Sequence, residues 1–307
     1  MRNYAIHQPR PEVYRITLVP PMEGFDNFIT AWVYRGEKTL LVDPGPSVTA
    51  GALLSALAEI GCRPDAILLT HIHIDHAGGV GRVSNAFPDT PVICHEKAVS
   101  HLVNPEKLWQ ATRQTLGAMA EAYGPIDPVP ETRLMNAAAL SCDLCRPVMT
   151  PGHAPHHVSY LTPDNTLFAG EAGGVHLDLG QNIFYLRPAT PPRFDLKITV
   201  ASLNRLIDAA PAAVCYGHNS LRTNAVELLC RHRQQLFSWQ ALIGNEMEKD
   251  ESDTLLSRCA DRLLKEDTLL AGLSQVGPAV FQREQFFIKN SLAGFIGYLN
   301  DLRSHAR

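Results

Sequence analysis

The feature that most constrains this chain is the run AILLTHIHIDHAGGV at residues 66–80. It begins as a short apolar segment and then places His71, His73, Asp75 and His76 within six positions. A short apolar run of this kind is typical of a buried strand in a layered α/β protein. The glycines that follow allow the backbone to turn tightly past whatever the polar side chains hold. The run therefore predicts a buried strand that ends in metal-ligand residues.

The same pattern recurs at three later strand ends. PVMTPG ends in His153, TLFAG ends in Glu171 and AVCYG ends in His218. Functional groups of layered α/β proteins gather at the carboxyl ends of neighbouring strands. We therefore expect the four strand ends to deliver seven side chains to one cleft.

These seven side chains divide between two divalent cations. The expected ligands are His71, His73 and His153 for the first ion, Asp75, His76 and His218 for the second, and Glu171 between the two. Imidazole and carboxylate favour zinc and also suit iron or manganese. A single histidine at a strand end is usually structural, but the full ordered set favours metal. It predicts a bridging hydroxide, formed because metals lower the pKa of water, that Asp75 could orient before passing a proton to the leaving group.

The remaining sequence suggests an α/β region followed by a helical one. Apolar runs with turn residues between them predict strands up to about residue 220, alternating with helices. Residues 180–194 are rich in proline and have no steady period, so we expect a loop there. After Thr223 the spacing is helical. The expected regions are 1–222, catalytic, and 223–307, helical.

Composition and net charge limit the partners and the cellular location that we expect. The chain has 307 residues, of which 45% are hydrophobic, and a net charge of -4, which gives no sign of a nucleic-acid partner. No secretory signal or membrane-spanning run is apparent, so a cytoplasmic protein without membrane association is expected. The seven cysteines are scattered, and Cys142 and Cys145 form a lone C-x-x-C that we interpret as two ordinary thiols rather than a zinc ribbon.

On these residues the chain resembles the metallo-β-lactamase superfamily. THIHIDHAGG matches the superfamily's T-H-x-H-x-D-H-x-G-G signature, and TPGHAPHHVSYL, FAGE and YGHN resemble its later motifs in the right order. The resemblance covers about residues 12–220. It implies a four-layer αβ/βα sandwich with the metals at one edge of two packed sheets, here with a C-terminal helical extension like that of hydroxyacylglutathione hydrolase.

Some positions depart from the superfamily's pattern. Glu171 stands where most members have Asp, although a Glu could still bridge two ions. His156 and Asn219 replace usual glycines. His157 matches a superfamily histidine that normally does not bind metal, so we expect it to support the ligands or the structure. Asp43, in the family-like DPG element, could orient a ligand histidine or simply form a turn.

The proline-rich segment after Glu171 is expected to hang over the metals. Tyr185 and Arg187 are its candidates for holding a substrate carbonyl or carboxylate, His176 is a weaker one, and packing is an equal alternative for each. The expected partner is a small-molecule substrate. Apolar residues in the helical tail are expected to pack on the sandwich, or on a second subunit in a homodimer.

The resemblance implies a dinuclear hydrolase acting on a small ester, thioester or lactone. An iron-dependent oxidoreductase like the persulfide dioxygenases shares the first motif and stays open as an alternative. A nuclease would be expected to carry an inserted domain and basic grooves, and neither is apparent. A non-enzymatic sensor is disfavoured because all ligand positions are filled.

Overall fold

The computed structural model describes residues 2–140, 143–181, 183–249 and 253–305. Its larger sheet has seven strands, arranged in chain order. The strands are β1 (Tyr4–Arg10), β2 (Val13–Leu18), β3 (Ile29–Arg35), β4 (Thr39–Val42), β5 (Ala66–Leu68), β6 (Val92–Cys94) and β7 (Leu134–Asn136). Pairing is antiparallel from β1 to β4 and parallel from β4 to β7.

A second sheet of five strands packs against the first. Its order is β14 (Leu221–Arg222), β13 (Ala213–Tyr216), β10 (Thr166–Gly170), β9 (Val158–Leu161) and β8 (Arg146–Met149). Only the β10–β13 pair of this sheet is parallel, which brings the carboxyl ends of these two strands to the same edge.

A hairpin of β11 (Val175–Asp178) and β12 (Phe184–Arg187) lies outside these two sheets. The prediction of a continuous loop over residues 180–194 is therefore wrong for β12. Phe184–Arg187 is extended because it pairs in antiparallel register with β11, a long-range partner that the local proline content does not reveal.

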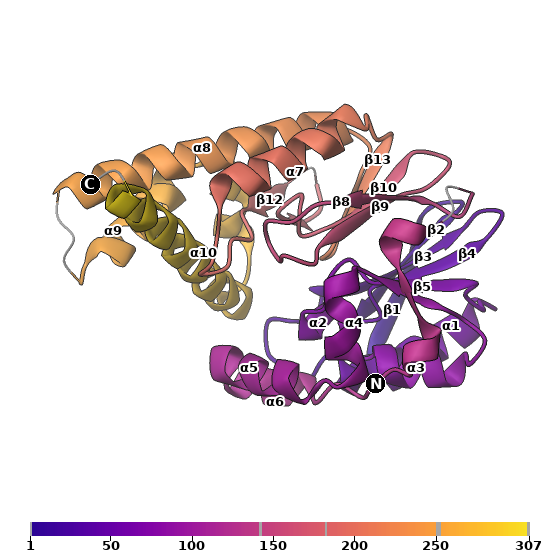
Figure 1. The fold of residues 1–307 in the computed structure, drawn as a ribbon. Helices are drawn as coiled ribbons and strands as arrows, with labels where there is room; N and C mark the ends of the chain where they lie inside the picture. The colour runs from indigo at the N-terminus through magenta and orange to yellow at the C-terminus, as the bar shows by residue number, and fades with distance from the viewer. Residues whose placement is uncertain (1, 141–142, 182, 250–252, 306–307) are drawn as a thin grey trace.

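Helices cover the outer face of each sheet, which gives the expected αβ/βα layers (Figure 1). The helices of the first half are α1 (Ala50–Glu59), α2 (Ile74–Ala77), α3 (Val80–Ala86), α4 (Glu96–Val103), α5 (Glu106–Leu116) and α6 (Ala118–Tyr123). Helix α7 (Leu196–Asp208) covers the second sheet on the opposite side of the molecule.

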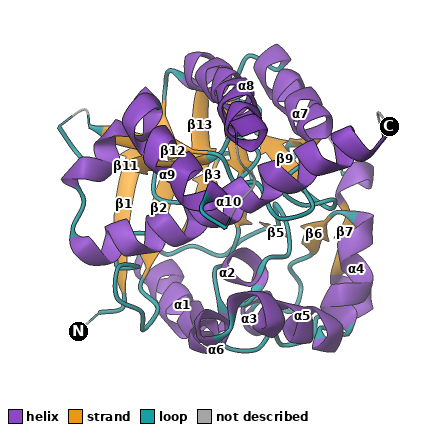
Figure 2. Cartoon of the chain, turned by 90° about the vertical axis from the view of Figure 1, so that its left-hand side faces the viewer, coloured by secondary structure: helices purple, strands orange, loops and turns teal. Residues whose placement is uncertain are grey.

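From Ala225 onward, the described residues contain helices and no strand. They form α8 (Ala225–Lys249), α9 (Leu255–Glu266), the 3-10 helix η4 (Thr268–Gln275) and α10 (Pro278–His305). Helix α8 packs on α7, α9 and α10, and η4 packs on β12. Figure 2 shows α10 crossing in front of the sheets, and in Figure 1 one end of α10 extends down toward α5. Across the described residues, no helix is both long enough and apolar enough to traverse a bilayer.

Two buried hydrogen bonds fix the sheets to each other close to the strand ends. Trp32 donates its indole N–H to the carbonyl of Tyr216 at 2.8 Å, and Tyr160 donates its hydroxyl to the carbonyl of Leu69 at 3.0 Å. Buried polar groups with satisfied partners specify a unique packing arrangement. Both carbonyls lie two residues before a predicted ligand, so these bonds place the two halves of the site relative to each other.

Candidate metal centre

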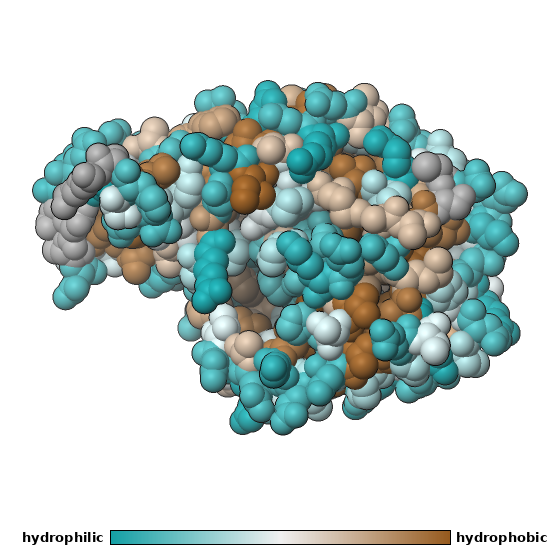
Figure 3. All heavy atoms as spheres, viewed as in Figure 1, coloured by the Kyte–Doolittle hydropathy of each residue, from teal (hydrophilic) through white to brown (hydrophobic). Residues whose placement is uncertain are grey.

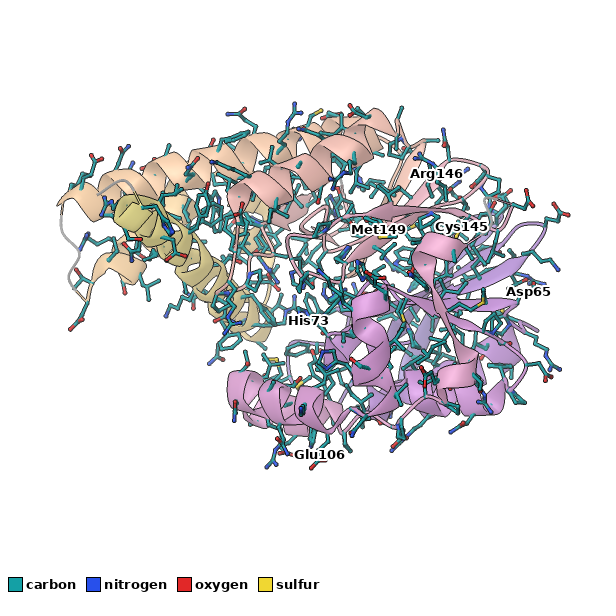
Figure 4. All side chains as sticks on the ribbon, viewed as in Figure 1. Asp65, His73, Glu106, Cys145, Arg146 and Met149 are labelled. Atoms are coloured by element: carbon teal, nitrogen blue, oxygen red, sulfur yellow. The ribbon has the colours of Figure 1, made fainter. Side chains whose placement is uncertain are left out.

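The structure brings all seven predicted ligands together at one edge of the sandwich. They follow β5, β8, β10 and β13, and they form two groups whose ligand atoms lie within 4.8 Å of one another. The first group is His71, His73, His153 and Glu171, and the second is Asp75, His76 and His218. Figure 4 shows His73 on the side of the molecule where α5 and α10 approach each other.

The first group is tightly packed. His153 Nε2 lies 2.8 Å from His73 Nδ1 and 2.8 Å from Glu171 Oε2. His71 Nε2 lies 3.4 Å from the same carboxylate oxygen. Three imidazole nitrogens and one carboxylate oxygen therefore converge on a common point.

The second group shares the carboxylate of Glu171 with the first. Asp75 Oδ2 lies 3.6 Å from His76 Nε2 and 3.7 Å from His218 Nε2. Glu171 Oε2 lies 3.7 Å from His76 Nε2, while its Oε1 lies 3.6 Å from His218 Nε2. Glu171 is one methylene longer than the Asp that most superfamily members have at this position, and its carboxylate lies close to both groups.

Hydrogen bonds to the far side of the rings orient several ligands. His76 Nδ1 lies 3.0 Å from Asp43 Oδ2, His153 Nδ1 lies 2.9 Å from the carbonyl of Ala189, and His218 Nδ1 lies 3.2 Å from the carbonyl of Phe28. The ring of Phe28 also stacks on His218 at 3.9 Å between centroids. These contacts turn each Nε2 toward the centre of the cluster.

Asp43 supports both groups through one carboxylate. It accepts hydrogen bonds from the backbone N–H of Thr70 at 2.8 Å and from the Thr70 hydroxyl at 2.6 Å. That hydroxyl lies 3.0 Å from His71 Nδ1. Asp43 has a φ of 53°, a left-handed conformation that is uncommon for a residue other than glycine. It is therefore held in place by the strand-end backbone as well as by its contact with His76.

His157 contacts the backbone of Glu171 rather than the centre of the cluster. Its Nε2 accepts the backbone N–H of Glu171 at 3.2 Å, so its proton is on Nδ1, which lies 2.8 Å from the Thr150 hydroxyl. Complete burial holds the pKa of His157 well below its ordinary value, which keeps the ring neutral. His157 therefore positions Glu171 by accepting a hydrogen bond from its main chain.

The donor set fits divalent cations. The Nε2 atoms of His71 and His76 are buried and have no hydrogen-bond partner among the residues that the structure describes, an arrangement that is costly unless another ligand is bound. Burial holds the pKa values of His71 and His73 well below 6.5, which keeps both rings in the neutral form that binds metal. For His76, burial opposes protonation, but the nearby Asp75 and Asp43 carboxylates raise its pKa to about 9. Cations would take the place of that proton.

A cavity of about 310 Å³ opens directly onto the cluster. Its walls come from α5 and α6 on one side and from α10 and residues 187–192 on the other. The wall residues Phe28, Tyr123 and Phe287 were not identified from the sequence, because they belong to no motif and lie far apart in the chain. The one sequence signal that could have indicated a cavity wall is the recurrence of uncharged residues every three or four positions in α5, from Leu108 to Leu116.

Of the three predicted substrate contacts, the structure places one, Arg187, at the cavity and the other two outside its lining. Arg187 lines the cavity, with its Nε donating to Glu284 Oε2 at 2.7 Å. Tyr185 is fully buried and lies outside the cavity lining. His176 also lies away from the cavity, stacked between Phe184 and Tyr216. Of the predicted C-x-x-C pair, Cys142 falls outside the described residues, and Cys145 is buried.

Comparisons with known proteins agree with this geometry. The metallo-beta-lactamase fold-containing protein ST1585 of Sulfurisphaera tokodaii is 31% identical over 71% of this chain and 82% of its own. A hydroxyacylglutathione hydrolase of Xanthomonas campestris is 31% identical over 69% of this chain and 67% of its own.

Solved structures show the same fold. The crystal structure of archaeal ST1585 covers 94% of this chain and 99% of its own, with a TM-score of 0.65 at 23% identity. A metallo-beta-lactamase family protein of Thermus thermophilus covers 100% of this chain and 95% of its own, with a TM-score of 0.58 at 20% identity. The model of the metallo-beta-lactamase superfamily matches residues 24–218. Its match spans both ligand groups and most of the two sheets, and the chain therefore belongs to the metallo-beta-lactamase superfamily.

Proposed function

We propose that the protein is a dinuclear metal-dependent hydrolase that acts on a small ester, thioester or lactone. Membership of a superfamily whose members include hydroxyacylglutathione hydrolases supports a hydrolase. The single observation that carries the dinuclear assignment is the position of Glu171, whose carboxylate lies within 4 Å of histidine nitrogens of both ligand groups. The proposed cations are zinc, with iron or manganese as alternatives.

Within this proposal, His71, His73 and His153 hold one cation, and Asp75, His76 and His218 hold the other. Such cations supply Lewis acidity and generate a nucleophile from water at neutral pH. Asp75 orients that nucleophile and can receive its proton, since its side chain retains some exposure, at 19%, toward the cavity. Asp43 and His157 keep His76 and Glu171 in place.

The experiment combines metal analysis with a substrate panel. Purified protein should contain two divalent ions per chain and hydrolyse members of a panel of esters, thioesters and lactones. His73→Ala should abolish that hydrolysis and lower the metal content, whereas His7→Ala, an exposed histidine on β1, should leave both unchanged. One iron per chain together with oxygen uptake on a persulfide would instead favour the dioxygenase-like alternative.

A further inference from the structure

The wall of the cavity indicates what kind of substrate reaches the metal centre. The cavity is continuous with His73, Asp75 and His153, so a bound molecule would contact the ligand cluster and the wall at once. In the space-filling view, the face is hollowed between the α5–α6 side and the C-terminal helices, and hydrophobic residues are visible inside the hollow (Figure 3).

Helix α5 provides one wall of this cavity. Its lining residues are Leu108, Ala111, Thr112, Thr115 and Leu116, and Met119 of α6 continues the stripe. Positions three and four apart lie on one face of a helix. Yet α5 has no buried residue. This face therefore lines the cavity, while its partly buried leucines, Leu108 and Leu116, also touch the edge of the core.

The facing wall is also apolar. Phe287 of α10, Phe28 and Pro191 line it, and Phe28 is the residue that stacks on His218. Helix α10 adds Asn290 and Ser291, which are polar but uncharged. A ligand between the two walls would exchange water for apolar side chains along most of its length, which favours apolar groups.

The charge on the wall is partly compensated, because Arg187 shares the carboxylate of Glu284 with Arg283. Outside the ligand cluster, Arg187 is the single charged side chain among the described lining residues. Its Nε donates to Glu284 at 2.7 Å and its Nη1 donates to the carbonyl of Pro188 at 3.2 Å. A carboxylate on the substrate would have to compete with the fully buried Glu284 for this guanidinium.

We propose that the substrate has an uncharged, apolar acyl portion that lies between α5 and α10, with its ester, thioester or lactone carbonyl at the metal centre. The reaction class in this statement rests on the proposed function. The apolar acyl portion rests on the cavity wall. It predicts that chain length, rather than negative charge, determines how well a molecule binds.

Binding of simple amides tests the wall independently of hydrolysis. Propanamide, pentanamide and heptanamide are uncharged and can be titrated into the protein by calorimetry. Affinity should rise about fourfold for each methylene that enters the apolar cavity. Ala111→Phe fills the cavity from α5 and should remove the gain from the longer chains. Gln110→Phe, an exposed residue outside the lining, is the matched control and should behave as wild type.

Hydrolysis of a thioester series then tests the complete proposal. Uncharged thioesters with longer acyl chains should be hydrolysed with a lower KM than the acetyl thioester, and all of them should be better substrates than the anionic S-lactoylglutathione. Affinity that is independent of amide length, or a preference for S-lactoylglutathione, would overturn the apolar assignment. Length-dependent amide binding without hydrolysis of any thioester, ester or lactone would support the cavity assignment and refute the proposed function instead.

Discussion

The floor and the walls of the cavity are built in contrasting ways. The floor consists of polar side chains at strand ends, such as His71 and His76, which are 1% exposed and held by hydrogen bonds to the side chains of Thr70 and Asp43. The α5 wall consists of leucine, alanine and threonine side chains, all uncharged, on a helix with no buried residue. Rigid strand ends suit chemistry that needs fixed ligands, and a loosely packed helix suits a surface that must accept a substrate. The following experiments test this contrast, from the largest expected effect to the smallest.

The largest effect is expected at Glu171. Glu171→Gln replaces the carboxylate between the two ligand groups by a neutral amide, which removes a negative charge that the two proposed cations would need. Hydrolysis should fall about a thousandfold or more, because metals contribute several kcal/mol of transition-state stabilisation. Steady-state kinetics and metal content measure the effect, with the exposed Glu121→Gln as the control. Wild-type activity at two ions per chain would contradict the bridging position.

Glu284 tests the α10 side of the cavity. Its two oxygens accept from Arg187 at 2.7 Å and from Arg283 at 2.8 Å, all in the protein core. Glu284→Gln leaves two buried guanidinium groups without a counter-charge and should lower the free energy of unfolding by about 3–5 kcal/mol. Denaturant titration measures the loss. The exposed pair of Glu227 and Arg231 provides the control, because Glu227→Gln should cost about 0.5 kcal/mol or less.

The carboxylate of Glu284 should also make the free energy of unfolding depend on pH in the acidic range. Burial opposes ionisation of Glu284, but Arg187 and Arg283 together lower its pKa below the ordinary value of 4.5. The unfolded chain then binds this proton more readily than the native protein does, so the stability is present above pH 4.5 and is lost as the pH falls below it. Glu284→Gln should flatten the stability profile in this range. An unchanged slope would show that other groups dominate acid unfolding.

A substitution at Asp43 tests how much the predicted metal centre depends on hydrogen bonds that orient its histidine ligands. Asp43→Asn cannot accept from both the Thr70 hydroxyl and His76 as the carboxylate does. Metal affinity should fall about 10- to 100-fold, as for other groups that orient ligand histidines. Competition with a chelator measures this fall. Asp89→Asn, at an exposed surface position, should leave the affinity unchanged.

The smallest effect is expected within the wall itself. Leu102 in α4 is fully buried, whereas Leu108 in α5 is only partly buried. Leu102→Ala should cost about 2–5 kcal/mol of unfolding free energy, and Leu108→Ala should cost less than about 1 kcal/mol. Equal losses in thermal or denaturant unfolding would mean that α5 packs as firmly as the core and would weaken the contrast drawn here.

Much of the floor could be predicted from the sequence because its signals are local. The H-x-H-x-D-H run and the residues that end the later strands lie next to apolar segments, so the strand pattern and the ligand pattern reinforce each other. Parallel neighbouring strands then bring the segments to one edge. The alternation of strands and helices predicted an α/β region, and the resemblance to the superfamily implied its αβ/βα layers. Strand β12 was missed because its partner strand is set by tertiary pairing.

The walls and the role of each supporting residue depended on the tertiary structure. Arg187 has the sequence character of a substrate contact, yet its Nε donates to Glu284, 97 positions away. Tyr185, two residues before it, points into the core. Local sequence determines which side chains follow a strand, because backbone geometry repeats over a few residues. Which charges are compensated and which apolar faces remain open depends on contacts between distant segments, and these exist only in the folded chain.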